Sequence, residues 1–110
     1  MNTEKQKRLE RLGWTVGGAA EFLQLTPEEA AFIELKLALA AAVKELREKQ
    51  GLTQTALAVR LGSSQSRVAK MEAGAPSVSL DLLIKSLLAI GARSADIAKW
   101  IKRAETTRAA

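Results

Sequence analysis

The sequence predicts an all-α protein, a bundle of about five helices with an N-terminal extension, on the strength of three observations. Apolar residues recur at spacings of three and four along most of the chain after Thr26, as in helices that bury one face. Threonine or serine precedes each stretch as a cap, and the first four stretches are followed by glycines at positions 51, 62, 74 and 91. The length of 110 residues suits one domain with a modest core.

The longest helix is expected from Pro27 to about Gln50. Thr26 is its cap, Pro27 takes the first helical position, and Glu29 completes a capping box. One apolar face consists of Phe32, Leu35, Leu39, Ala42, Val43 and Leu46, and a second flank of Ile33, Leu37, Ala40 and Ala41. A helix that is apolar around so much of its circumference needs cover on more than one side.

Two short helices around a tight corner are expected from Thr53 to Gly74. Thr53 caps the first helix, and the serines at 63 and 64 reopen the chain before a second helix begins at Gln65. Gly62 lies at the corner because glycine reaches positive φ at little steric cost. The inward positions are Leu57, Ala58 and Leu61 in the first helix and Val68 and Met71 in the second.

Two further helices complete the bundle. Ser79 caps one that runs from Leu80 to about Ile90, and Ser94 caps the last one. The last helix carries Ile97, Trp100 and Ile101 on one side. We expect a partly irregular N-terminal extension at residues 1–25, a central helical domain at residues 26–92, and a C-terminal helix and tail at residues 93–110.

The stretch TQTALAVRLGSSQSRVAKMEAG, residues 53–74, resembles the helix-turn-helix of the Xre/Cro phage-repressor-like family. The matching features are Gln54, Leu57-Ala58, Leu61-Gly62, Val68, Met71 and the exit Glu72-Ala73-Gly74. LREKQGLTQ before it resembles the first helix of that fold. The resemblance implies a DNA-binding domain at residues 26–92, an ion pair between Arg47 and Glu72, and a phosphate contact at Gln54. A generic helical hairpin is the alternative.

DNA contacts are expected from the second short helix, whose first residues approach the base edges of the major groove. Steps of about 100° place Ser66 and Lys70 opposite the inward residues, with Arg67 beside them and Gln65 at the tip. Gln pairs with adenine, and Arg or Lys with guanine, so these four residues are the expected base readers. Phosphate contacts are expected from Thr53, Gln54, Arg60, Ser77, Ser79 and Lys85. The alternative is a merely solvated polar face.

The composition favours a binding protein over an enzyme. The chain has no cysteine, histidine or tyrosine, so disulfides, thiolate chemistry and the commonest acid–base residue are lacking. We expect no metal and no cofactor. No apolar run is long enough for a membrane span and no signal peptide is evident, so a cytoplasmic protein is expected. The net charge of +5 comes from residues 53–110, which include nine basic and four acidic residues. A basic surplus in this half of the chain is what phosphate binding requires.

We expect a repressor of an operator in double-stranded DNA, acting as a homodimer because one recognition helix covers only a few base pairs. Ile97, Trp100 and Ile101 could form the dimer seam or cover the protomer's own core. The segments GW-V-G, EFL, TPEEAAFIELKLAL and SSQSRVAKMEAG resemble the antitoxins of type II toxin–antitoxin systems, which implies a ribonuclease-type toxin as partner. Its expected contacts are Trp14, Val16, Phe22 and Leu23, unless these pack on the chain's own helices. A stand-alone regulator and a protein-interaction module remain the alternatives.

Overall fold

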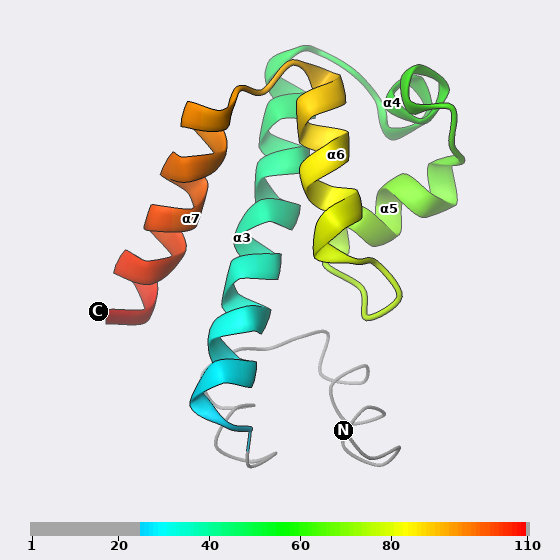
Figure 1. Cartoon of the computed structure of the whole chain (residues 1–110). Helices are drawn as coiled ribbons and strands as arrows, with labels where there is room; N and C mark the ends of the chain where they lie inside the picture. Colours follow the sequence, from blue (N-terminus) through cyan, green and yellow to red (C-terminus); the bar gives the residue numbers. More distant parts are fainter. Residues whose placement is uncertain (1–24, 110) are drawn as a thin grey trace.

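The computed structural model describes residues 25–109, and these residues form five helices and no strand, which confirms the predicted all-α class (Figure 1). The helices are α3 (Pro27–Lys49), α4 (Gln54–Leu61), α5 (Gln65–Ala73), α6 (Leu80–Ile90) and α7 (Ser94–Ala109). The expected partner contacts at Trp14, Val16, Phe22 and Leu23 lie outside the described residues. Within those residues, no helix has both the length and the apolar content needed to cross a membrane.

The long helix α3 is the centre of the bundle, with α7 on one side and α5 and α6 on the other (Figure 1). It begins as predicted: the Thr26 hydroxyl accepts the backbone N–H of Glu29 at 3.1 Å, and the Glu29 carboxylate accepts that of Thr26 at 3.0 Å. The core beneath it is contributed by every helix. Its largest fully buried side chains are Leu39, Val43, Leu57, Val68, Met71, Leu83, Leu87 and Ile90.

The predicted apolar face of α3 is wrong at one end. Phe32 is 47% exposed, whereas Ile33 of the other flank is buried. Phe32 lies two turns before the buried Leu39 on nearly the same line, so its exposure results from position along the helix. The first turns of α3 extend past the start of α6 (Figure 1).

The predicted start of the last helix is also wrong, by one residue. Ser94 is the first residue of α7, and Arg93 takes the cap position because its carbonyl accepts the N–H of Ile97. The carboxylate of Asp96 accepts the N–H of Arg93 at 2.8 Å. Asp96, the third residue of the helix, thus accepts the N–H of the cap residue, as the acidic member of a capping box does, whereas a serine at the cap would accept an N–H of the first turn.

The three apolar residues expected on one side of α7 divide between two roles. Ile97 belongs to the buried core, and Trp100 packs against that core while partly exposed. Ile101 is 39% exposed. The protomer's own core therefore uses two of the three residues considered for a dimer seam.

Candidate nucleic-acid interface

The corner between α4 and α5 is built from caps and left-handed glycines. The hydroxyl of Thr53 accepts the N–H of Ala56 at 3.0 Å, and that of Ser64 accepts the N–H of Arg67 at 3.1 Å. Gly62 and Gly74, which end the two helices, both have φ of 64°, a conformation that glycine adopts without strain. These local signals fix where α5 begins and ends.

One face of α5 is buried and the opposite face is open. Val68 and Met71 are fully buried, whereas Ser66, Lys70 and Ala73, about half a turn away, are exposed. Gln65 and Arg67 lie on opposite flanks of the open face and are exposed as well. The four expected base readers therefore occupy the exposed surface of one short helix, at its first two turns.

A two-point ion pair joins α3 to α5. Arg47 Nε lies 2.6 Å from Glu72 Oε2, and Arg47 Nη2 lies 3.0 Å from Glu72 Oε1. Arg47 Nη1 also donates to the carbonyl of Leu52 at 2.8 Å. The two side chains are only 12% and 5% exposed, and the hydrogen bond to Glu72 raises the pKa of Arg47 above its usual value. A buried charge pair with this many partners holds the far end of α5 against α3.

Further hydrogen bonds link the ion pair to the first residue of α5. Gln54 Nε2 donates to Glu72 Oε1 at 3.1 Å, and Gln65 Nε2 donates to Gln54 Oε1 at 2.7 Å. An ionised carboxylate only accepts hydrogen bonds, so the amide nitrogen of Gln54 must face Glu72 and its oxygen must face Gln65. Arg47, Glu72, Gln54 and Gln65 thus form one chain of hydrogen bonds, the glutamine network. This linking role of Gln54 was not predicted from the sequence.

The network orients the amide of Gln65. One of its N–H groups is used by Gln54, and among the described residues its oxygen and second N–H make no other hydrogen bond. An oxygen and an N–H side by side are the groups that glutamine offers to adenine. The side chain at the tip of α5 is therefore presented in a fixed direction with its pairing groups open.

The expected phosphate contacts are scattered over the domain. Thr53 and Ser79 cap α4 and α6, and Ser77 is exposed in the loop before α6. Arg60, at the other end of α4, donates to Gln50 at 2.9 Å. Lys85 pairs with Asp81 at 3.0 Å on the exposed side of α6. The structure therefore places only Thr53 and Gln54 at the start of α4.

The helix-turn-helix family matches residues 43–96, a range that holds the end of α3, all of α4 to α6 and the start of α7. A search of the curated proteins and a search of the solved structures each found no match. The matched residues include α4 and α5, the two helices that carry the open face and the glutamine network. Residues 43–96 are a helix-turn-helix domain of the Xre/Cro-like family.

Proposed function

We propose that this protein is a sequence-specific DNA-binding regulator that represses transcription from an operator in the cytoplasm. The observation that carries the proposal is the exposed face of α5, on which Gln65 is held by the glutamine network beside Ser66 and Lys70. Two fixed pairing groups on Gln65 suit adenine, and the ammonium group of Lys70 suits the acceptors of guanine. The family match supports the DNA-binding part of the proposal.

The start of α4 supplies a backbone contact in this proposal. The first N–H groups of a helix lack partners within the helix and carry the positive end of its dipole, so they attract phosphate. Gln54 is the first residue of α4 and is hydrogen-bonded to the tip of α5. A phosphate bound at α4 would therefore fix the position of the base-reading helix relative to one DNA strand.

We further propose that the protein binds as a homodimer through the outer faces of α6 and α7. Leu88 of α6 is 47% exposed and Ile101 of α7 is among the exposed large apolar residues. Two-fold symmetry would place two recognition helices in successive major grooves, about 34 Å apart. Sedimentation of the purified protein, alone and with Leu88→Glu, tests this: the variant is expected to be monomeric and the wild type dimeric.

The test of DNA reading starts from a pool of random duplexes, from which the wild-type protein selects its preferred sequence. Binding to the selected duplex is expected to exceed binding to a scrambled one by roughly a thousandfold or more at the same salt concentration. Lys70→Ala should lose about 1–3 kcal/mol on the selected duplex only. Lys99→Ala, on the exposed side of α7, is the control. A wild-type protein that enriches no sequence would refute the proposal.

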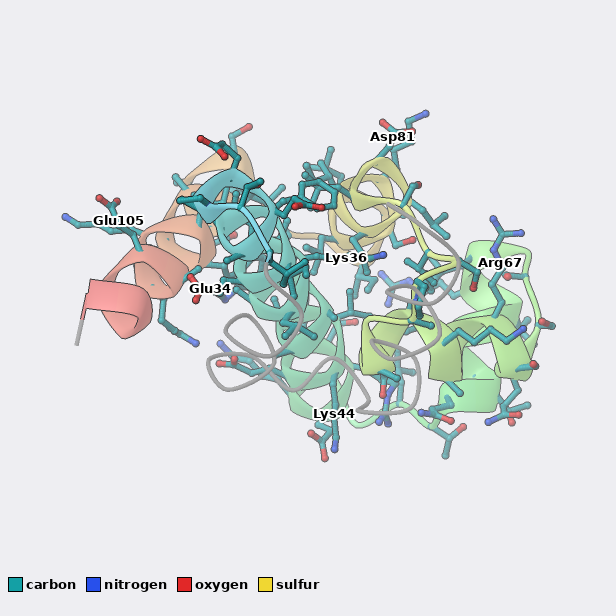
Figure 2. The ribbon with its side chains drawn as sticks, turned by 90° about the horizontal axis from the view of Figure 1, so that it is seen from below. Glu34, Lys36, Lys44, Arg67, Asp81 and Glu105 are labelled. Carbon is teal, nitrogen blue, oxygen red and sulfur yellow. The ribbon has the colours of Figure 1, made fainter. Side chains whose placement is uncertain are left out.

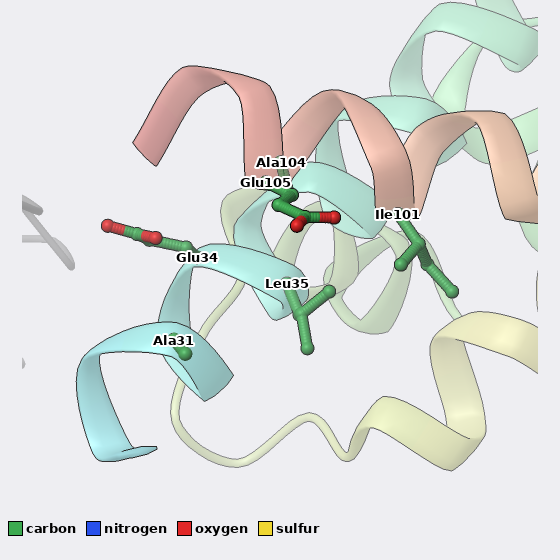
Figure 3. Close-up of a pocket in the computed structure, with 6 residues that line it drawn as sticks. All are labelled: Ala31, Glu34, Leu35, Ile101, Ala104 and Glu105. Carbon is green, nitrogen blue, oxygen red and sulfur yellow. The ribbon is translucent and has the colours of Figure 1, made fainter. Parts of the chain in front are cut away.

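A second candidate function is that of an antitoxin that binds a ribonuclease-type toxin, supported by an apolar groove between α3 and α7. A cavity of about 190 Å³ there is lined by Ala31, Glu34, Leu35, Ile101, Ala104 and Glu105 (Figure 3). Leu35 and Ile101 point to the same side of it (Figure 3). The exposed Phe32 precedes Leu35 by about one turn of α3. One wall of the groove is α7, which lies on the opposite side of α3 from α5 (Figure 1), so a protein partner there leaves α5 accessible to DNA.

Deletion of residues 1–24 tests the antitoxin function, because the expected anchors Trp14, Val16, Phe22 and Leu23 all lie there. The truncated protein should bind the selected duplex within a few-fold of wild type but fail to co-purify with the product of the neighbouring gene. Leu35→Asp in the full chain is expected to weaken co-purification as well, because Leu35 lines the groove and lies outside the proposed dimer face. A large drop in melting temperature with unchanged partner binding would mean that the segment belongs to the protein's own core.

A further inference from the structure

Arg67 leaves α5 on a different flank from Gln65. The two residues are separated by about 200° around the helix, so their side chains project toward different neighbouring helices. Gln65 bonds to Gln54 on the α4 side, whereas Arg67 lies on the side of α6. Figure 2 shows Arg67 reaching outward from the recognition helix toward the side of the molecule where Asp81 lies. Arg67 is thus less aligned with the open face of α5 than Ser66 and Lys70 are.

Arg67 lines a cleft between the α4–α5 corner, α5 and α6. The cleft has a volume of about 340 Å³ and is lined by Leu61, Gly62, Ser63, Arg67, Met71, Leu82, Lys85, Ser86 and Ala89. Its charged lining consists of the two cations Arg67 and Lys85, and no carboxylate takes part. Its walls carry apolar side chains from α4, α5 and α6, with Ser63 of the corner beside them, and the buried hydroxyl of Ser86 donates to the sulfur of Met71 at 3.4 Å.

The nearest acidic group weakens but does not cancel this charge. Asp81 lies one turn from Lys85 and pairs with it at 3.0 Å, but both side chains are more than 70% exposed. Exposed pairs of this kind contribute only about 0–1 kcal/mol, so Lys85 can exchange this partner for an external anion at little cost. For Arg67 the structure records no ion pair among the described residues.

We propose that this Arg67–Lys85 cleft binds the sugar-phosphate backbone of one DNA strand, and that Arg67 positions the domain rather than reading a base. The inference rests on the proposed DNA-binding function. A DNA backbone alternates anionic phosphates with the apolar faces of deoxyribose, and the cleft offers cations beside apolar side chains such as Leu82. The phosphates would meet Arg67 and Lys85, with the sugar against the apolar wall.

The geometry of the major groove supports this assignment. A helix in a groove about 12 Å wide has one phosphate backbone on each side. The start of α4 faces one of them, because Gln54 adjoins the tip of α5 on that flank. The cleft lies on the opposite flank of α5, where the second backbone would run. The loop after α5, residues 75–78, carries no basic residue, so the cleft supplies the cations that this side otherwise lacks.

The experiment measures the dissociation constants of Arg67→Ala and Lys85→Ala on the selected and scrambled duplexes over a series of salt concentrations. Each variant is expected to weaken binding by about tenfold on both duplexes and to reduce the slope of log K against log salt by about 0.9. Lys70→Ala should weaken binding to the selected duplex alone, and Lys99→Ala should change neither. Arg67→Lys should keep the slope, since a phosphate contact needs charge more than shape.

Neutral methylphosphonates, placed one at a time in the selected duplex, locate the contact. One position is expected to weaken the wild type but to have little further effect on Arg67→Ala. Loss on the selected duplex alone by Arg67→Ala, with an unchanged slope, would overturn the inference and make Arg67 a base reader. Equal wild-type binding to all duplexes would instead refute the proposed function. If the wild type still prefers the selected duplex, but Arg67→Ala and Lys85→Ala bind both duplexes as the wild type does, the cleft proposal is refuted and the proposed function is not. Melting curves confirm that each variant is folded.

Discussion

Removal of the Glu72 carboxylate is the most severe single change that the structure predicts for this domain. In Glu72→Ala three donors lose their acceptor: two N–H groups of Arg47 and one of Gln54. Arg47 keeps its bond to the carbonyl of Leu52, but its charge stays in a site where the side chain is only 12% exposed. The cost therefore comes mainly from stranding a buried guanidinium, and only partly from lost attraction.

The magnitude follows from these contacts. Removal of one partner of a buried pair typically costs about 3–5 kcal/mol, and the lower half of that range is expected because Arg47 keeps its hydrogen bond to the carbonyl of Leu52. At roughly 4–8 °C for each kcal/mol, a loss of about 3–4 kcal/mol corresponds to a fall in melting temperature of roughly 12–32 °C. Glu72→Gln should cost less, about 1–3 kcal/mol, because its amide oxygen still accepts one of the hydrogen bonds.

Chemical and thermal denaturation, followed by circular dichroism, measure these losses. The decisive variant is the double replacement Arg47→Met with Glu72→Met, which removes both charges and fills the space with apolar atoms. It should recover most of the stability lost by either single replacement, because no charge is then stranded. If the double variant is as unstable as the sum of the two singles, or if Glu72→Ala loses less than about 1 kcal/mol, the reasoning is wrong.

Three further outcomes are expected. Gly74→Ala should lose about 0.5–1.5 kcal/mol more than Gly62→Ala, because both have φ of 64° but only at Gly74 would a Cβ meet a neighbour, the terminal Cδ2 of Leu37 at 2.8 Å, which must then turn away; equal losses in urea titrations would contradict this. Burial lowers the pKa of Lys36 below 10.5, so just below that pH the unfolded chain binds more protons than the folded one. The unfolding free energy of the wild type, relative to that of Lys36→Met, should therefore rise with pH in this range. A difference that does not change with pH would contradict the lowered pKa. Gln54→Ala should weaken binding to the scrambled duplex as well as to the selected one, because a phosphate contact is lost on both, and unchanged binding to the scrambled duplex would contradict a phosphate contact at Gln54.

The sequence predicts the helices of this domain well because their ends are fixed locally. The Thr26–Glu29 capping box and the left-handed Gly62 and Gly74 depend on residues within one turn of each other. Phe32 was predicted wrongly for the opposite reason. Its exposure depends on how far α6 extends beside α3, a tertiary distance that periodicity within α3 does not contain.

The candidate site shows the same division between local and tertiary information. Periodicity identifies Ser66 and Lys70 as the residues opposite Val68 and Met71, and the structure exposes both. It does not show that Gln54 faces Glu72, because that contact joins residues 18 positions apart through the crossing of α4 and α5. A polar pair at the starts of two consecutive short helices, Gln54 and Gln65, was the available signal. The contact of Arg67 with the cleft beside α6 depends on where α6 packs, and no local sequence pattern indicates that position.

The ion pair and the proposed base-reading side chains share an atom, because Glu72 Oε1 accepts hydrogen bonds from both Arg47 and Gln54. A variant that moves this oxygen should therefore loosen the domain and disorient the amide of Gln65 together. Weak DNA binding by a Glu72 variant is then no evidence of a contact between Glu72 and DNA. Gln54→Ala separates the two effects, since it disconnects Gln65 from the ion pair while Arg47 and Glu72 keep both of their mutual hydrogen bonds. If the chain of bonds orients Gln65, this variant should lose adenine preference at one base pair in addition to its uniform loss of affinity, with the ion pair and most of the folding stability retained.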